Sequence, residues 1–135
     1  MSGTLPVLIV SGVSQSRDGL AQLVSKCELR PVCCETLAAA KALMTRQQFA
    51  IIVCEDLLLD GNFHAMVGEG TRRRGKQPVI VVSSRDDWDS YLLSMRAGAF
   101  DCLSFSSEAG EVDRILAAAL QEYRLSAETA VQSEA

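Results

Sequence analysis

Continuous apolar runs alternate with stretches of helical periodicity along most of this chain. Runs without polar interruption are typical of strands that are buried on both faces of a sheet. We expect five strands, at residues 7–10, 30–35, 49–56, 78–84 and 99–105. Each is followed by a predicted helix, starting near residues 16, 36, 63, 84 and 107, and Gly68 and Gly70 make the third helix the weakest.

Strands that are apolar on both faces require helices on both sides of a parallel sheet, with right-handed crossovers. The pattern therefore predicts an α/β fold, a doubly wound (βα)5 sandwich. A chain of 135 residues has room for one such domain. We expect this domain to span residues 1–125, and residues 126–135 to form a polar, irregular tail or the start of a linker.

Composition excludes several classes of function. The net charge of −4 argues against direct binding to nucleic acid or to a membrane surface. No targeting segment precedes the first strand, and no apolar run approaches the ~18 residues of a membrane span, so we expect a cytoplasmic protein. The five cysteines lack CxxC spacing, which favours buried free thiols over a metal site. We expect no metal and no cofactor.

The third apolar run ends on two acidic residues, Glu55 and Asp56. Open α/β sheets bind ligands in the crevice at the carboxyl ends of their strands, so a carboxylate there marks a candidate site. Ser83, at the end of the fourth run, is predicted to lie at the same edge. Its hydroxyl would either donate a hydrogen bond to Glu55 or, together with Ser84, cap the following helix.

Three segments together resemble the receiver domain of two-component response regulators, the CheY-like variant of the flavodoxin-like fold. They are the strand-end acid followed by the turn at Asp60 and Gly61, the run 78–83, and residues 97–101 before the last strand. The resemblance covers about residues 5–124 and implies a sheet order of 2-1-3-4-5. It also implies a bacterial phosphorelay signalling pathway.

In typical receivers, an aspartate at the end of the third strand accepts a phosphoryl group with the help of Mg²⁺ and a lysine. The resemblance places Glu55 at the acceptor position, with Asp56 as the alternative if the register shifts by one residue. The remaining positions of the family carry Ser11 and Gly12 (acidic pair), Ser83 (hydroxyl), Cys102 (switch aromatic), Phe105 (lysine) and Ser106 (proline). Without the acidic pair and the lysine, a transferring phosphoryl group has no stabilisation, so we expect a degenerate pseudo-receiver.

Three functions follow from this interpretation. We favour a signalling module, not an enzyme, that contacts a sensor kinase, an effector or a second copy through its fourth helix, fifth strand and fifth helix. The alternative is a working phosphoacceptor that uses Asp56 or Asp60. A small enzyme or nucleotide binder on the same fold is disfavoured, because the loop after the first strand lacks GxGxxG and GxxxxGK[ST].

Two finer questions concern particular side chains. Glu55 either imitates a phosphorylated aspartate or is a former acceptor that has drifted to any tolerated acid. Trp88 and Tyr91 stand at helical spacing with Leu92 and Met95, which favours a place in the core over an exposed contact patch.

Overall fold

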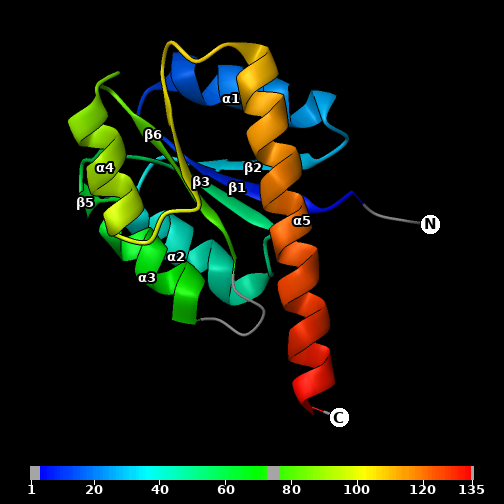
Figure 1. Ribbon diagram of the computed structural model, residues 1–135. Helices are drawn as coiled ribbons and strands as arrows, with labels where there is room; N and C mark the ends of the chain where they lie inside the picture. The colour runs from blue at the N-terminus through cyan, green and yellow to red at the C-terminus, as the bar shows by residue number, and fades with distance from the viewer. Residues whose placement is uncertain (1–3, 73–76, 135) are drawn as a thin grey trace.

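A five-stranded parallel sheet forms the centre of the molecule (Figure 1). The computed structural model describes residues 4–72 and 77–134. The strands of this sheet are β1 (Pro6–Val10), β2 (Arg30–Cys34), β3 (Ile51–Glu55), β6 (Val79–Ser83) and β7 (Asp101–Ser104). They lie in the order β2-β1-β3-β6-β7, and every neighbouring pair is parallel. This is the predicted 2-1-3-4-5 order of a doubly wound CheY-like fold.

Helices follow each sheet strand in the described part of the chain. They are α1 (Ser14–Lys26), α2 (Leu37–Arg46), α3 (His64–Arg72), α4 (Trp88–Arg96) and α5 (Ala109–Glu134). The glycines at 68 and 70 do not interrupt α3. The expectation of an irregular tail after residue 125 is wrong, because α5 continues to Glu134.

Two apolar cores cover the two faces of the sheet. Val24 of α1 and Leu116 of α5 pack with Ile9 and Val53 on one face. Residues of α2 and α3 pack with β1, β3 and β6 on the other face, and Figure 1 shows α1 lying opposite α2 and α3 across the sheet. None of the described helices is long and apolar enough to cross a membrane.

Side-chain caps fix where α2 and α4 begin. Thr36 accepts a hydrogen bond from the backbone N–H of Ala39, which is the predicted cap of α2. Helix α4 begins later than the sequence pattern predicts. Its cap is Asp87, which accepts from the backbone N–H of Ser90 at 2.8 Å, so Ser83 and Ser84 lie before the helix and do not cap it.

A short antiparallel hairpin follows β3, formed by β4 (Leu57–Leu58) and β5 (Gly61–Asn62). Asp60 of the predicted turn therefore lies at the tip of this hairpin, and Gly61 begins its second strand. Gly61 has a φ of +149°, and an added Cβ would lie 2.6 Å from the Cδ1 atom of Leu37. This close approach requires glycine and sets the hairpin directly against α2.

Candidate functional site

Glu55 is the last residue of β3 and is almost completely buried, at 4% exposure. Its Oε1 atom accepts a hydrogen bond from the backbone N–H of Gly12, 2.6 Å away. Because Gly12 lies in the loop after β1, this bond joins the carboxyl ends of two neighbouring strands. A short bond from a backbone N–H to a buried carboxylate is the kind of contact that holds a charged group in place.

Asp56 points to a different neighbour, β6 and the loop that follows it. Its Oδ2 atom lies 3.3 Å from the Ser83 hydroxyl and 3.4 Å from the Ser84 hydroxyl, and the Ser84 backbone N–H also lies 3.4 Å from this carboxylate. The hydrogen bond that we considered between Ser83 and Glu55 is therefore made to Asp56. The contact from Ser84 was missed, although the adjacent pair of serines at the strand end is a visible signal for it.

Ser83 has a second partner. Its hydroxyl accepts a hydrogen bond from the backbone N–H of Arg85 at 3.0 Å while it donates to Asp56. The side chain is 1% exposed, and both bonds fix its rotamer. The hydroxyl therefore has a defined orientation at the carboxyl edge of the sheet.

The loop after β1 offers little to a cation. The Ser11 side chain is fully buried, and its hydroxyl donates to the carbonyl of Val13 at 3.2 Å and accepts from the Val13 backbone N–H at 3.3 Å. The Arg17 guanidinium donates to the Ser11 carbonyl at 2.8 Å and pairs with Glu35 at 3.5 Å. The hydroxyl and the carbonyl of Ser11 are thus bonded to Val13 and to Arg17 of α1.

The resemblance predicts that Phe105 replaces the family's lysine. This residue lies in the loop after β7 with 48% of its surface exposed. Cys102, which the resemblance matches to the switch aromatic, is partly buried, and this burial raises the pKa of its thiol. Three serine hydroxyls cluster at the end of β7 and in the loop after it, with Ser104 Oγ 2.9 Å from Ser106 Oγ and 3.5 Å from Ser107 Oγ.

Asp60, the other acid that we considered as an acceptor, is committed to helix α2. Its two carboxylate oxygens accept the backbone N–H groups of Leu37 at 2.9 Å and Ala38 at 3.0 Å. These bonds lower the pKa of the carboxyl group below its ordinary value. Asp60 therefore satisfies free donors in the first turn of α2 and fixes the hairpin to that helix.

The donor set at this edge does not fit Mg²⁺, which prefers several anionic or carbonyl oxygens in octahedral geometry. Glu55 is bonded to Gly12 and Ser11 to Val13, and Asp56 faces Ser83 and Ser84. Among the described residues, no group of three or more His, Cys, Asp or Glu side chains is placed to hold a metal ion.

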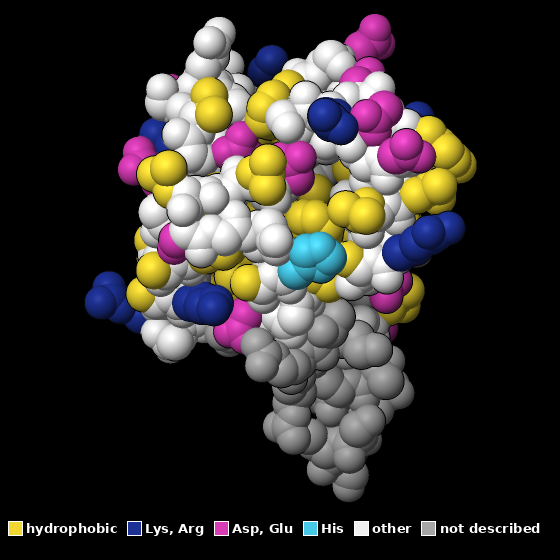
Figure 2. Space-filling view, turned by 90° about the vertical axis from the view of Figure 1, so that its left-hand side faces the viewer, with side chains coloured by type: hydrophobic (Ala, Val, Ile, Leu, Met, Phe, Trp, Pro, Cys, Tyr) yellow, Lys and Arg dark blue, Asp and Glu magenta, His cyan; other side chains and the backbone are white. Residues whose placement is uncertain are grey.

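The α4 side of the molecule exposes aromatic and apolar groups. Trp88 is 69% exposed, so its predicted place in the core is wrong. Its ring stacks on Tyr91 with centroids 5.3 Å apart and an interplanar angle of 19°. Leu93 of the same helix is 61% exposed. Figure 2 looks onto the side where α3, α4 and the hairpin lie and shows hydrophobic side chains spread among charged ones.

No protein-family model matches the chain. The response regulator protein PilR of Pseudomonas aeruginosa is 25% identical over 114 residues, which are 84% of this chain and 26% of PilR. The chain thus spans about a quarter of the length of that relative.

Solved structures match the fold over most of its length. The signal receiver domain of an HD domain-containing protein from Pseudomonas fluorescens Pf-5 superimposes with a TM-score of 0.83, covers 95% of each chain and is 15% identical. The beryllofluoride-activated NtrC4 receiver domain dimer has a TM-score of 0.79, covers 87% of this chain and 98% of its own, and is 19% identical. In strand order, in overall superposition and in its sequence likeness to PilR, the chain has the CheY-like fold of response regulator receiver domains and resembles that family.

Proposed function

We propose that the chain is a receiver-like signalling module of a two-component type pathway that acts by protein–protein contact and is not switched by Mg²⁺-dependent phosphorylation of an aspartate. The proposal rests on the residues at the carboxyl edge of the sheet. By the resemblance, Phe105 stands at the position of the family's lysine. In the loop after β1, the Ser11 hydroxyl and the Gly12 N–H are already hydrogen-bonded within the protein.

Within this proposal, Asp56 is the equivalent of the acceptor and Glu55 is a structural residue. The support is the direction of the two side chains, because Asp56 contacts Ser83 and Ser84 whereas Glu55 contacts the Gly12 backbone. In the family resemblance, the acceptor is the carboxylate that faces the hydroxyl after the fourth strand of the sheet. This assignment reverses the register that we favoured from sequence, and it leaves no role for Glu55 as an imitation of a phosphorylated aspartate.

Phosphoryl transfer to Asp56 would lack stabilisation at the transition state. The charge on the transferring oxygens needs a divalent cation or fixed cationic side chains. Ser83 and the Ser84 N–H are neutral donors near Asp56, and neutral donors contribute less than charged ones.

The test is incubation with acetyl phosphate, and separately with beryllofluoride, each with and without Mg²⁺. Intact mass and the amide chemical shifts of Asp56, Ser83 and Ser84 report the result. We expect no Mg²⁺-dependent gain in mass and no saturable shift, while a conventional receiver treated in parallel responds. A Mg²⁺-dependent phosphorylated species that disappears in Asp56→Asn would establish the alternative, a working phosphoacceptor.

For the contact surface, we propose the face formed by α4, β7 and α5. Trp88 offers exposed apolar area there and lies beside residues of β7 and α5, and the NtrC4 receiver domain, a structural neighbour, is described as a dimer. We expect the chain to self-associate through this face. Sedimentation velocity should show a dimer that Trp88→Glu dissociates. Leu59→Glu, which removes an apolar side chain that is 94% exposed on the hairpin, is the matched control and should leave the dimer intact.

A further inference from the structure

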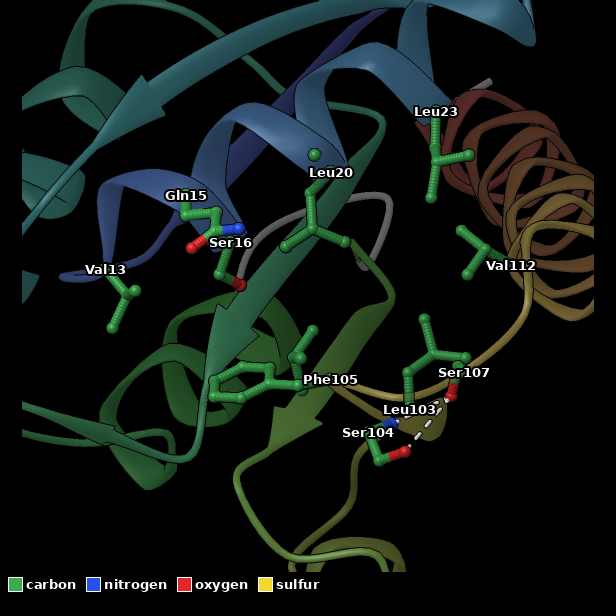
Figure 3. A pocket seen from close by; sticks show the side chains of 12 residues that line it. Val13, Gln15, Ser16, Leu20, Leu23, Leu103, Ser104, Phe105, Ser107 and Val112 are labelled. Atoms are coloured by element: carbon green, nitrogen blue, oxygen red, sulfur yellow. Dashed lines mark hydrogen bonds between the residues drawn. The ribbon is translucent and has the colours of Figure 1, made fainter.

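A cavity of about 390 Å³ lies between α1 and the start of α5, at the carboxyl edge of the sheet (Figure 3). Its floor is made by Val82 of β6 and Leu103 of β7, both buried. Leu20 and Leu23 of α1 close one side, and Val112 of α5 closes the other. The volume falls within the ~300–1,000 Å³ that small-molecule sites occupy.

The lining carries no charged side chain. Its polar members are Gln15 and Ser16 of α1, Ser104 at the end of β7, and Ser107 in the loop that leads to α5. Ser104 and Ser107 bond to each other, since the Ser104 backbone N–H donates to Ser107 Oγ at 3.0 Å (Figure 3). Gln15 and Ser16 lie near the rim, where they are available to a polar edge of a ligand.

Phe105 determines which chemistry this cavity accepts. The family resemblance gives this position to a lysine, which would place a cation at the cavity and favour an anion. The aromatic ring offers a flat apolar wall instead, suited to stacking. Burying a charge among uncharged walls is costly, so an ionised ligand is disfavoured.

We propose that this cavity binds a neutral small molecule with an aromatic or otherwise apolar body and one polar edge. Such a ligand contacts β7 and α5, two elements of the face proposed for partner contact, and would regulate that contact. The binding itself does not depend on the proposed function, whereas this regulation rests on it.

The probe is indole, titrated to millimolar concentration and followed by two-dimensional amide NMR. We expect saturable shifts centred on Gly19, Leu20, Leu103, Phe105 and Val112. Indole-3-carboxylate, which has the same ring system and a negative charge, should bind at least tenfold more weakly because no cation lines the site.

Gly19 offers a variant that fills the cavity. A Cβ added at this helical position meets no atom within 4 Å, so Gly19→Leu can enter the space without moving the backbone. Gly110→Leu is the matched control, because that glycine is also helical, is also free of neighbours within 4 Å, and does not line the cavity. Circular dichroism and unfolding curves verify that both variants fold.

We expect Gly19→Leu to weaken indole binding at least tenfold and Gly110→Leu to leave it within twofold. Phe105→Ala should also weaken it several-fold through the loss of the ring. Absence of saturable shifts, shifts centred elsewhere, or equal affinity in the two glycine variants would each overturn the site. If indole binds here but does not change the dimer measured by sedimentation, the site stands and its regulatory role fails. A Mg²⁺-dependent phosphorylated species would refute the proposed function without affecting this site.

Discussion

Replacing Glu55 tests whether a buried carboxylate holds the end of β3 to the loop after β1. The side chain is 4% exposed, and Oε1 accepts the Gly12 N–H at 2.6 Å. A hydrogen bond to a charged group contributes about 1.5–3 kcal/mol, and loss of a buried methylene adds about 0.8 kcal/mol. Glu55→Ala should therefore lower the free energy of unfolding by about 2–4 kcal/mol.

Glu55→Gln separates charge from shape. The amide oxygen can still accept the Gly12 N–H, but a neutral hydrogen bond contributes only about 0.5–1.5 kcal/mol. We expect this variant to lose about 1 kcal/mol, between wild type and Glu55→Ala. Glu122→Ala is the control, because this exposed glutamate of α5 should change stability by no more than about 0.5 kcal/mol.

Urea unfolding followed by far-ultraviolet circular dichroism is the assay. Fluorescence is less suitable, because the one tryptophan, Trp88, is 69% exposed and changes its surroundings little on unfolding. With an m-value of about 2 kcal/mol/M, Glu55→Ala should lower the midpoint by about 1–2 M. A Glu55→Ala midpoint equal to that of Glu122→Ala would refute the structural role of Glu55. The free-energy cost of burying this carboxylate would then equal the stabilisation from its hydrogen bond.

Three further predictions concern the hairpin and the thiols. Gly61→Ala should destabilise the protein by about 1–3 kcal/mol in the same urea assay, because the left-handed φ is strained for alanine and the added Cβ meets Leu37; no loss would show that α2 can retreat. The pKa of Asp60 is lowered in the folded protein, so its contribution is present above the ordinary value of 3.8 and is lost as the pH falls below it. When the pH falls from about 6 to about 3, Asp60→Asn should accordingly lose less stability than the wild type. Equal losses in the two proteins would contradict the role of the Asp60 carboxylate at the start of α2. Iodoacetamide at about pH 8 should modify the exposed Cys33 well before Cys54, because burial strongly raises the pKa of the Cys54 thiol. Peptide mass mapping of a time course measures the order of modification, and the reverse order would contradict this reasoning.

Periodicity alone was enough to locate the elements of the sheet. Continuous apolar runs at 7–10 and 78–84 correspond to β1 and β6, which are buried apart from the partly exposed Pro6. A run without polar alternation does not show which face of the sheet each side chain occupies. The pattern therefore could not tell whether Glu55 or Asp56 faces the candidate site. The hydrogen bonds to Gly12 and Ser83 supply that distinction.

Two errors came from relying on apolar spacing alone. Trp88 has the spacing of a core residue, but the buried residue of α4 is Ser94, whose hydroxyl bonds to the Ser90 carbonyl. Residues 126–134 have no apolar stripe in the sequence and still continue α5, because alanine, glutamate and glutamine have high helix propensity. The pairing of β4 with β5 could not be predicted from hydrophobic periodicity either, because a strand of two residues is too short to show a period.

Gly12 and Glu55 are physically connected in the folded chain. A Cβ added at Gly12 would lie 4.0 Å from Glu55 Oε1, so an aspartate side chain at position 12 that turns toward Glu55 would bring a second carboxylate close to a buried one. Two like charges about 4 Å apart repel by between about 1 kcal/mol in water and about 4 kcal/mol near a protein surface, and the repulsion weakens as they separate. Gly12→Asp should therefore destabilise the protein in the Glu55 background and much less in Glu55→Ala, which a double-mutant cycle in urea measures. Additive effects would show that the two side chains do not interact. A coupling of more than about 1 kcal/mol would show that Glu55 repels an acid placed at position 12.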